Sequence, residues 1–179
     1  MLKKYICNFL KIRESNNIIS IIILASYRLS NKIYNSKKIP IIYRGLMIFV
    51  KIINFVIRVI FGIELPYECI IGDNFLLAHG GRGVVIHPKS KIGDNVSIYH
   101  NVTIGGTALA HYIMSDGSKE CVRGGVPIIG NGVLVGASSS IIGSVKIGNN
   151  VKIGANTVVT KSIDDNSTVI SANVRIIKY

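Results

Sequence analysis

An aliphatic residue recurs every six positions over residues 86–159 of this 179-residue chain, and no other feature constrains the fold as strongly. The series has two parts: Ile86, Ile92, Ile98 and Ile104, then Ile129, Val135, Ile141, Ile147, Ile153 and Val159. A period of six fits neither the 3.6-residue period of an amphipathic helix nor the 8–12-residue spacing of hairpin turns. It is typical of a hexapeptide-repeat β-helix, in which each unit adds a short strand and a turn to a stack with a shared core.

The N-terminal third carries a different pattern. Residues 1–61 show apolar faces with the period of a helix, and a polar break at residues 35–38 precedes Pro40. Gly62 follows, and glycine commonly ends a helix. We therefore predict an N-terminal helical segment over residues 1–61 and a β-helix domain over residues 62–179.

The stretch 41–61 is apolar almost all round, and its three cations, Arg44, Lys51 and Arg58, recur every seven residues on one stripe. A membrane-spanning helix would take these charges into hydrocarbon, at about 2.5–3.5 kcal/mol each near the centre. A helix lying on a membrane surface keeps the stripe in water, and so does a helix packed on the β-helix or on a neighbouring subunit. We expect one of these last two arrangements, and peripheral contact with the inner face of a membrane stays open.

The formal charge of +12 is concentrated at the N-terminus. Residues 1–66 hold 11 Lys/Arg and 2 Glu, hence +9, whereas residues 67–179 hold 10 Lys/Arg and 7 Asp/Glu, hence +3. No nucleic-acid-binding motif accompanies this charge, so we expect no nucleic-acid partner. The three cysteines are widely spaced and odd in number, which favours a reducing cytoplasm over a disulfide framework. The apolar run 18–25 has no clean cleavage site after it, which argues against a secretory signal.

The repeat contains one insertion. Leu77 and Ile86 lie nine positions apart where the period demands six, and Gly80-Gly81-Arg82 are the natural extra residues. Glycines at a bulge supply backbone conformations that other residues avoid, and bulges often lie beside active sites. His79 directly precedes this bulge. Without the insertion, His79 and His100 lie 18 residues apart, so in a coil of three hexads both imidazoles share one outer face of adjacent coils, about 4.8 Å apart.

The repeat is also interrupted between Ile104 and Ile129, and we predict that residues 107–127 form a loop extruded from the coil. A long loop inside a compact domain is usually functional or disordered.

The four histidines give little support to a metal site. The gaps between His79, His87, His100 and His111 are 8, 13 and 11 residues, so no two histidines are closely spaced. The hexapeptide-repeat carbonic anhydrases use three histidines, two of them close in sequence. We therefore expect no metal and regard a zinc enzyme of this kind as a less favoured alternative.

Several runs of this chain resemble the core of the serine acetyltransferases and of their relatives in bacterial surface-glycan synthesis. They are residues 79–88 (HGGRGVVIHP), 96–107 (VSIYHNVTIGGT), 135–137 (VGA) and 153–159 (IGANTVV). The resemblance covers about residues 62–177. It implies a mainly β fold, a left-handed parallel β-helix, that assembles as a homotrimer with acetyl-CoA as co-substrate in the cleft between subunits. The handedness follows from the family alone, because parallel crossovers are normally right-handed.

The resemblance also implies roles for single residues. His79 matches the general base, and Glu64 matches the acidic residue that orients it, with Glu in place of Asp. His100 stands where the family commonly has an amide and offers a second imidazole. Coenzyme-lining backbone is implied at Gly105, Gly106, Thr107, Ala137 and Ala155. An imidazole can take the proton of a hydroxyl that attacks a thioester, and we expect direct transfer because no cysteine lies near His79 in the repeat.

Two departures from the family bear on the acceptor. The acidic residue just before the base is Ala78 here, and the histidine that follows the extruded loop aligns with Val126. Both help the serine enzymes hold their amino-acid acceptor, so their replacement favours a hydroxyl of a cell-surface glycan or its precursor over L-serine. The predicted function is O-acetyl transfer to one of these acceptors. The alternative is a catalytically silent β-helix trimer that serves as a scaffold.

Overall fold

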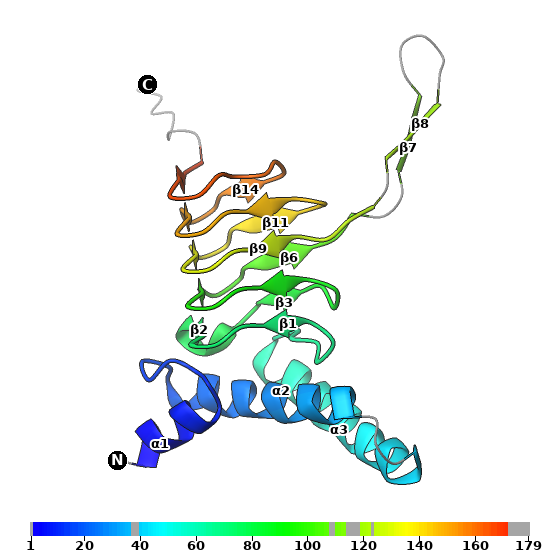
Figure 1. Ribbon diagram of the computed structural model, residues 1–179, viewed down its shortest axis with the longest axis vertical. Helices are drawn as coiled ribbons and strands as arrows, with labels where there is room; N and C mark the ends of the chain where they lie inside the picture. The colour runs from blue at the N-terminus through cyan, green and yellow to red at the C-terminus, as the bar shows by residue number, and fades with distance from the viewer. Residues whose placement is uncertain (1, 37–39, 108–109, 114–118, 123, 172–179) are drawn as a thin grey trace, which may run out of the picture.

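The computed structural model describes residues 2–36, 40–107, 110–113, 119–122 and 124–171. Three helices come first: α1 (Leu2–Phe9), α2 (Ile18–Ser36) and α3 (Pro40–Phe61). Short strands then stack as coils over α2, and the C-terminal end of the stack lies farthest from the helices (Figure 1). The predicted fold class, a mainly β parallel β-helix with N-terminal helices, is confirmed.

The coil strands form three parallel sheets. The first has the order β1 (Ile70–Ile71), β4 (Lys91–Ile92), β9 (Ile128–Ile129), β12 (Lys146–Ile147). The second has the order β15 (Thr168–Val169), β13 (Lys152–Ile153), β10 (Leu134–Val135), β5 (Ser97–Ile98), β2 (Leu76–Leu77). The third has the order β14 (Val158–Val159), β11 (Ser140–Ile142), β6 (Thr103–Gly105), β3 (Val85–Ile86).

The hexad residues fill the inside of the coils. All ten, from Ile86 to Val159, are buried, and none is more than 4% exposed. The register pairs them with one another, so that Ile104 lies between Ile86 and Ile141 in the third sheet. Like side chains therefore stack from coil to coil, which gives the solenoid a continuous close-packed core.

The predicted insertion before β3 is confirmed by the register. Leu77 pairs with Ile98 and Ile86 with Ile104, so nine residues on one coil span what six span on the next. The extra residues form the turn η1 (Ala78–Gly81) and its continuation to Gly83. This turn carries His79 at a corner between the second and third sheets.

The chain between α1 and α2 differs from the predicted helical segment. Residues 10–17 leave the helix, and Ile12 forms a bridge with Phe75, next to β2. Asn16 is fully buried and its side-chain amide donates to the Phe75 carbonyl at 2.9 Å. The apolar period could not reveal this, because the segment gains its partners only from the edge of the folded coil.

α2 covers the first coil and pairs with its open edge (Figure 1). Four α2 side chains donate to carbonyl groups there: Ser20 to Leu77, Tyr27 to Cys69, Arg28 to Ile71 and Gly72, and Asn31 to Tyr67. These carbonyls belong to the terminal coil, which has no further coil below it to pair with. α2 is therefore the cap of the solenoid, the element that end coils need.

Ser20→Ala should lower the free energy of unfolding by about 1–3 kcal/mol, because it removes a donor from a buried carbonyl. Ser20 is fully buried and its Oγ lies 2.6 Å from the Leu77 oxygen. Urea denaturation measures the change. Ser36→Ala is the matched control, since Ser36 also lies on α2 and donates to a carbonyl, that of Ile33, but at an exposed position. Equal losses in the two variants would contradict a capping role for Ser20.

Two strands within the predicted loop 107–127 lie outside the stack, so the described part of this segment is not strandless. β7 (Ala110–Ile113) and β8 (Lys119–Val122) pair as an antiparallel hairpin, with Ala110 opposite Val122. The hairpin projects away from the coils (Figure 1). At its base the Thr107 amide donates to the Gly125 carbonyl at 2.9 Å.

Candidate active site

His79 and His100 lie on successive coils at one corner of the stack. Leu77 pairs with Ile98, and each histidine follows its partner by two residues. The ring centroids are 5.2 Å apart and the ring planes meet at 82°, so the edge of one imidazole faces the other. The prediction that both imidazoles lie on one outer face of adjacent coils is confirmed. Tyr99 completes the group, with its ring centroid 5.7 Å from that of His79.

The backbone at His79 is in the left-handed region, with φ 54° and ψ 31°. This conformation is uncommon for a histidine and is found mostly at turns and functional sites. Gly80 and Gly81 follow with φ of 74° and 64°, and a Cβ on Gly81 would lie 2.5 Å from a methyl of Leu77. The glycines thus allow the chain to turn sharply here, and the turn leaves the His79 side chain exposed.

The two imidazoles line an open hollow between the coils and the start of α2. Four other residues line it: Asn17, Ile19, Arg82 and Asn101. The Nδ1 atom of His100 is buried and has no hydrogen-bond partner among the described residues. Among the described residues, no hydrogen bond to that nitrogen therefore holds the His100 ring in place. Asn17 and Ile19 were not predicted from the sequence, because they reach the hollow only through the docking of α2.

Ala137 and Ala155 continue the column above the two histidines. Ile98, Val135 and Ile153 are in register, and His100, Ala137 and Ala155 each follow by two residues. The Ser138 amide donates to the His100 carbonyl at 3.0 Å, and the Asn156 amide to the Ala137 carbonyl at 2.9 Å. We call these four residues, His79, His100, Ala137 and Ala155, the histidine column. Small side chains above the imidazoles leave this corner open.

The other candidate coenzyme-lining residues, Gly105, Gly106 and Thr107, lie outside the histidine column. Gly105 ends β6, which begins three residues after His100, so β6 runs from the histidine column to this glycine segment. A Cβ on Gly106 would lie 3.1 Å from the Gly125 oxygen and 3.3 Å from the His87 ring. The predicted coenzyme-lining residues therefore form two groups at opposite ends of the third-sheet strands, which separate them within one chain.

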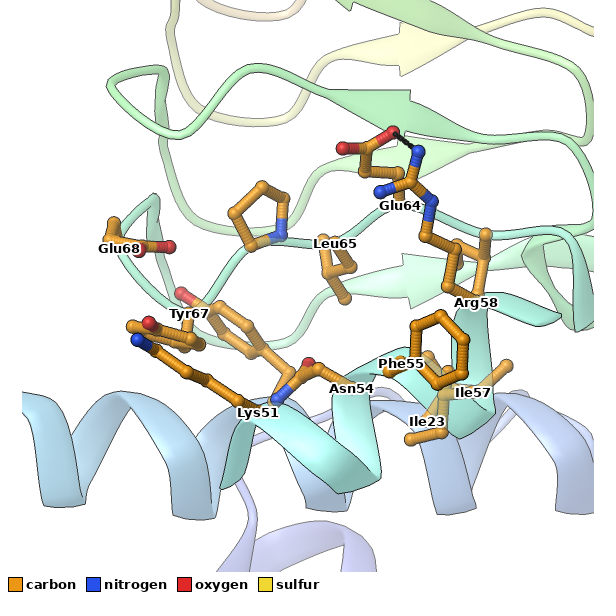
Figure 2. A pocket seen from close by; sticks show the side chains of 13 residues that line it. Ile23, Lys51, Asn54, Phe55, Ile57, Arg58, Glu64, Leu65, Tyr67 and Glu68 are labelled. Atoms are coloured by element: carbon orange, nitrogen blue, oxygen red, sulfur yellow. Dashed lines mark ion pairs between the residues drawn. The ribbon is translucent and has the colours of Figure 1, made fainter. Parts of the chain in front are cut away.

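The structure does not bring Glu64 to His79. Glu64 forms a bridge with Val85, and its carboxylate lies 3.5 Å from the guanidinium of Arg58 (Figure 2). It lines a cavity of about 240 Å³ between α3 and the first coil, together with Lys51, whereas His79 lines the other hollow. In the described part of the chain, no hydrogen bond or ion pair joins Glu64 to His79. The predicted contact is thus absent among the described residues, because the Glu64 backbone pairs beside β3 while its side chain points toward Arg58 on α3.

Cys7 and Cys69 are buried free thiols. Burial raises the pKa of the Cys69 thiol to about 12, so this thiol stays protonated at neutral pH. Neither thiol lines the hollow beside His79. The side chains of Cys121 and His111 lie outside the described residues. Over the described ranges, no group of three or more metal-ligating side chains could hold a metal ion.

Comparisons with known proteins agree with this architecture. Residues 127–161 match the family model of the bacterial transferase hexapeptide (six repeats). The chain is a hexapeptide-repeat protein, the class that the coil and its register define.

Within that class it is a relative of the serine acetyltransferases. It is 37% identical over 153 residues to a serine acetyltransferase of Staphylococcus aureus, a match that covers 86% of this chain but only 62% of that protein. Solved structures similar to it include two serine acetyltransferase complexes. One is the serine acetyltransferase from Brucella abortus in complex with coenzyme A, with 28% identity, a TM-score of 0.68 and coverage of 89% of this chain and 56% of the other. The other is the Neisseria gonorrhoeae enzyme in complex with serine, with 25% identity, a TM-score of 0.67 and coverage of 88% and 56%.

Proposed function

We propose that this protein is an O-acetyltransferase that uses acetyl-CoA and a hydroxyl acceptor, with His79 as the general base. The observation that carries the proposal is the histidine column, in which two imidazoles 5.2 Å apart share an open hollow. The names of the relatives and the coenzyme A complex of the Brucella abortus protein support the co-substrate.

The proposed reaction needs one base and no covalent enzyme intermediate. His79 accepts the proton of the acceptor hydroxyl as its oxygen attacks the thioester carbonyl. The tetrahedral intermediate collapses, the carbon–sulfur bond breaks, and the imidazolium returns the proton to the departing sulfur. The products are an acetyl ester and coenzyme A with a free thiol. The absence of Cys7 and Cys69 from the hollow is in keeping with direct transfer.

The two groups of candidate coenzyme-lining residues suggest that the complete site needs a second chain. The histidine column and the segment Gly105–Thr107 lie at opposite ends of the third-sheet strands. In a homotrimer, the column of one subunit could face the glycine segment of the next, which would give the coenzyme walls from two chains. We therefore propose a homotrimer as the active form.

The acceptor is either L-serine or a hydroxyl of a surface glycan. The relatives' names and the serine complex of the Neisseria gonorrhoeae protein support L-serine. Ala78 and Val126, which replace an acidic residue and a histidine of the family pattern, favour the glycan. One assay separates them: release of free thiol from acetyl-CoA with L-serine or with purified surface polysaccharide as acceptor. If neither acceptor gives thiol release, and if substitution of His79 does not change the rate, the silent scaffold is favoured.

Glu64→Gln should change kcat/KM for thiol release by less than about threefold, because Glu64 contacts Arg58 and not His79. The side chains of this pair are 42% and 63% exposed, and such surface pairs contribute about 0–1 kcal/mol to stability. Steady-state kinetics measure the change in kcat/KM, and urea denaturation measures the change in the free energy of unfolding. A fall of a hundredfold in kcat at unchanged stability would show instead that Glu64 orients the base in the assembled enzyme.

A further inference from the structure

α3 leaves a continuous apolar face uncovered. Its inner side packs against α2 and the first coil, and Met47 and Val50 on that side are only 9% and 2% exposed. The outer side carries six large apolar side chains that are each 55–66% exposed: Ile48, Phe49, Ile52, Phe55, Val59 and Ile60. Positions three, four and seven apart share one side of a helix, so these residues form a single stripe. We call this stripe the α3 face.

Positive charge borders the α3 face. Lys51 and Arg58 are exposed and lie seven residues apart along one margin of the stripe, and Arg58 also lies 3.5 Å from the Glu64 carboxylate. The α3 sequence contains no Asp or Glu. The wider N-terminal region adds to this charge, because residues 1–66 hold 11 Lys/Arg and 2 Glu, hence +9. Apolar and cationic side chains on one exposed helix are the pattern of helices that bind anionic membrane surfaces.

The charges of α3 favour contact with a plane over passage through a bilayer. No helix in the described part of the chain has the length and apolar character needed to cross a membrane. Lys51, in the middle of α3, would have to enter the hydrocarbon core of a spanning helix. The 22 residues of α3 extend about 33 Å, and the helix lies at the end of the molecule opposite the C-terminal coils (Figure 1).

We propose that the α3 face binds the surface of an anionic phospholipid bilayer, with α3 lying in the plane of the interface. The apolar side chains enter the boundary between head groups and acyl chains, and Lys51 and Arg58 lie near lipid phosphates. Charge argues against contact between the α3 faces of two copies, because it would bring two +9 segments together. The proposal does not depend on the reaction and would hold equally for a silent scaffold.

The test is co-sedimentation of the full chain with lipid vesicles at low salt. Vesicles of phosphatidylcholine and phosphatidylglycerol at three to one should bind the protein at least about tenfold more strongly than phosphatidylcholine alone, since each nearby cation adds roughly a fivefold gain. Val59→Glu should lower binding to the anionic vesicles about tenfold. Val158→Glu is the matched control and should leave binding unchanged, because Val158 on β14 is 69% exposed and Val59 is 66% exposed.

Three results would overturn the proposal. One is that the wild-type chain binds neither kind of vesicle. A second is that Val158→Glu weakens binding as much as Val59→Glu does. A third combines two measurements: the wild-type chain does not bind the vesicles, and light scattering without vesicles shows a change of oligomeric mass in Val59→Glu but not in Val158→Glu. That result would make a second copy the occupant of the α3 face. Thermal melting monitored by circular dichroism shows that each variant is folded.

Discussion

Replacement of His79 by Asn should lower kcat/KM for acetyl-CoA-dependent thiol release by about 10²–10⁴-fold, the usual contribution of a general base. Asn is the informative substitute because position 79 has φ 54°, a conformation that Asn tolerates better than most residues. Most of the other non-glycine residues with positive φ are also Asn, among them Asn95, Asn101 and Asn150. The variant should therefore lose the imidazole and keep the turn.

Two companion variants separate chemistry from structure. His87→Asn should retain most of the activity, because the His87 ring accepts a hydrogen bond from the Lys89 amide at 3.2 Å and lies outside the histidine column. His79→Ala should lose activity to the same extent as His79→Asn and also some stability, since Ala is strained at positive φ. Retention of more than a tenth of the wild-type kcat/KM in His79→Asn would contradict the role of base.

A large effect on stability is expected at Gly130, where Gly130→Ala should lower the free energy of unfolding by about 3 kcal/mol. A Cβ at this position would lie 2.7 Å from the Gly148 oxygen and 2.8 Å from its carbonyl carbon. Both atoms belong to the backbone of the next coil, so no side chain can move aside to relieve the contact. The coils would have to separate locally, and the stacked core would loosen with them.

Gly45→Ala provides the opposite case in the same measurement. Gly45 lies in α3, and a Cβ there would have no atom within 4 Å. Alanine is the better helix former, so this variant should gain about 0.5–1 kcal/mol. Chemical denaturation of the two variants beside the wild type checks both signs. A loss at Gly130→Ala of less than about 0.5 kcal/mol would show that the coils are not packed as closely as the structure has them.

The repeat made the coil predictable from the sequence because its physical cause is local and periodic. Each hexad residue such as Ile98 or Ile141 must point inward for the stack to have a core, and both are fully buried. The same counting located the insertion after His79 and placed that ring beside His100. Register in a solenoid follows from sequence separation alone, which is seldom true of other β folds.

The features that escaped prediction depend on contacts between segments far apart in the chain. Glu64 lies fifteen residues before His79, but its carboxylate faces Arg58 on α3, and no periodicity reports where α3 docks. The segment around Ile12 leaves its helix to pair beside β2 for the same reason. The pairing of β7 with β8 also escaped prediction, because these segments lack the six-residue period on which the rest of the prediction was built.

The most direct test of the account is a crystal structure of the full chain with coenzyme A bound. We predict that the thiol end of the coenzyme lies against the imidazoles of His79 and His100, with the segment Gly105–Thr107 of a second chain across the same cleft. Coenzyme bound in the cavity beside Lys51 and Arg58, or a histidine column remote from any second chain and from the coenzyme, would contradict it.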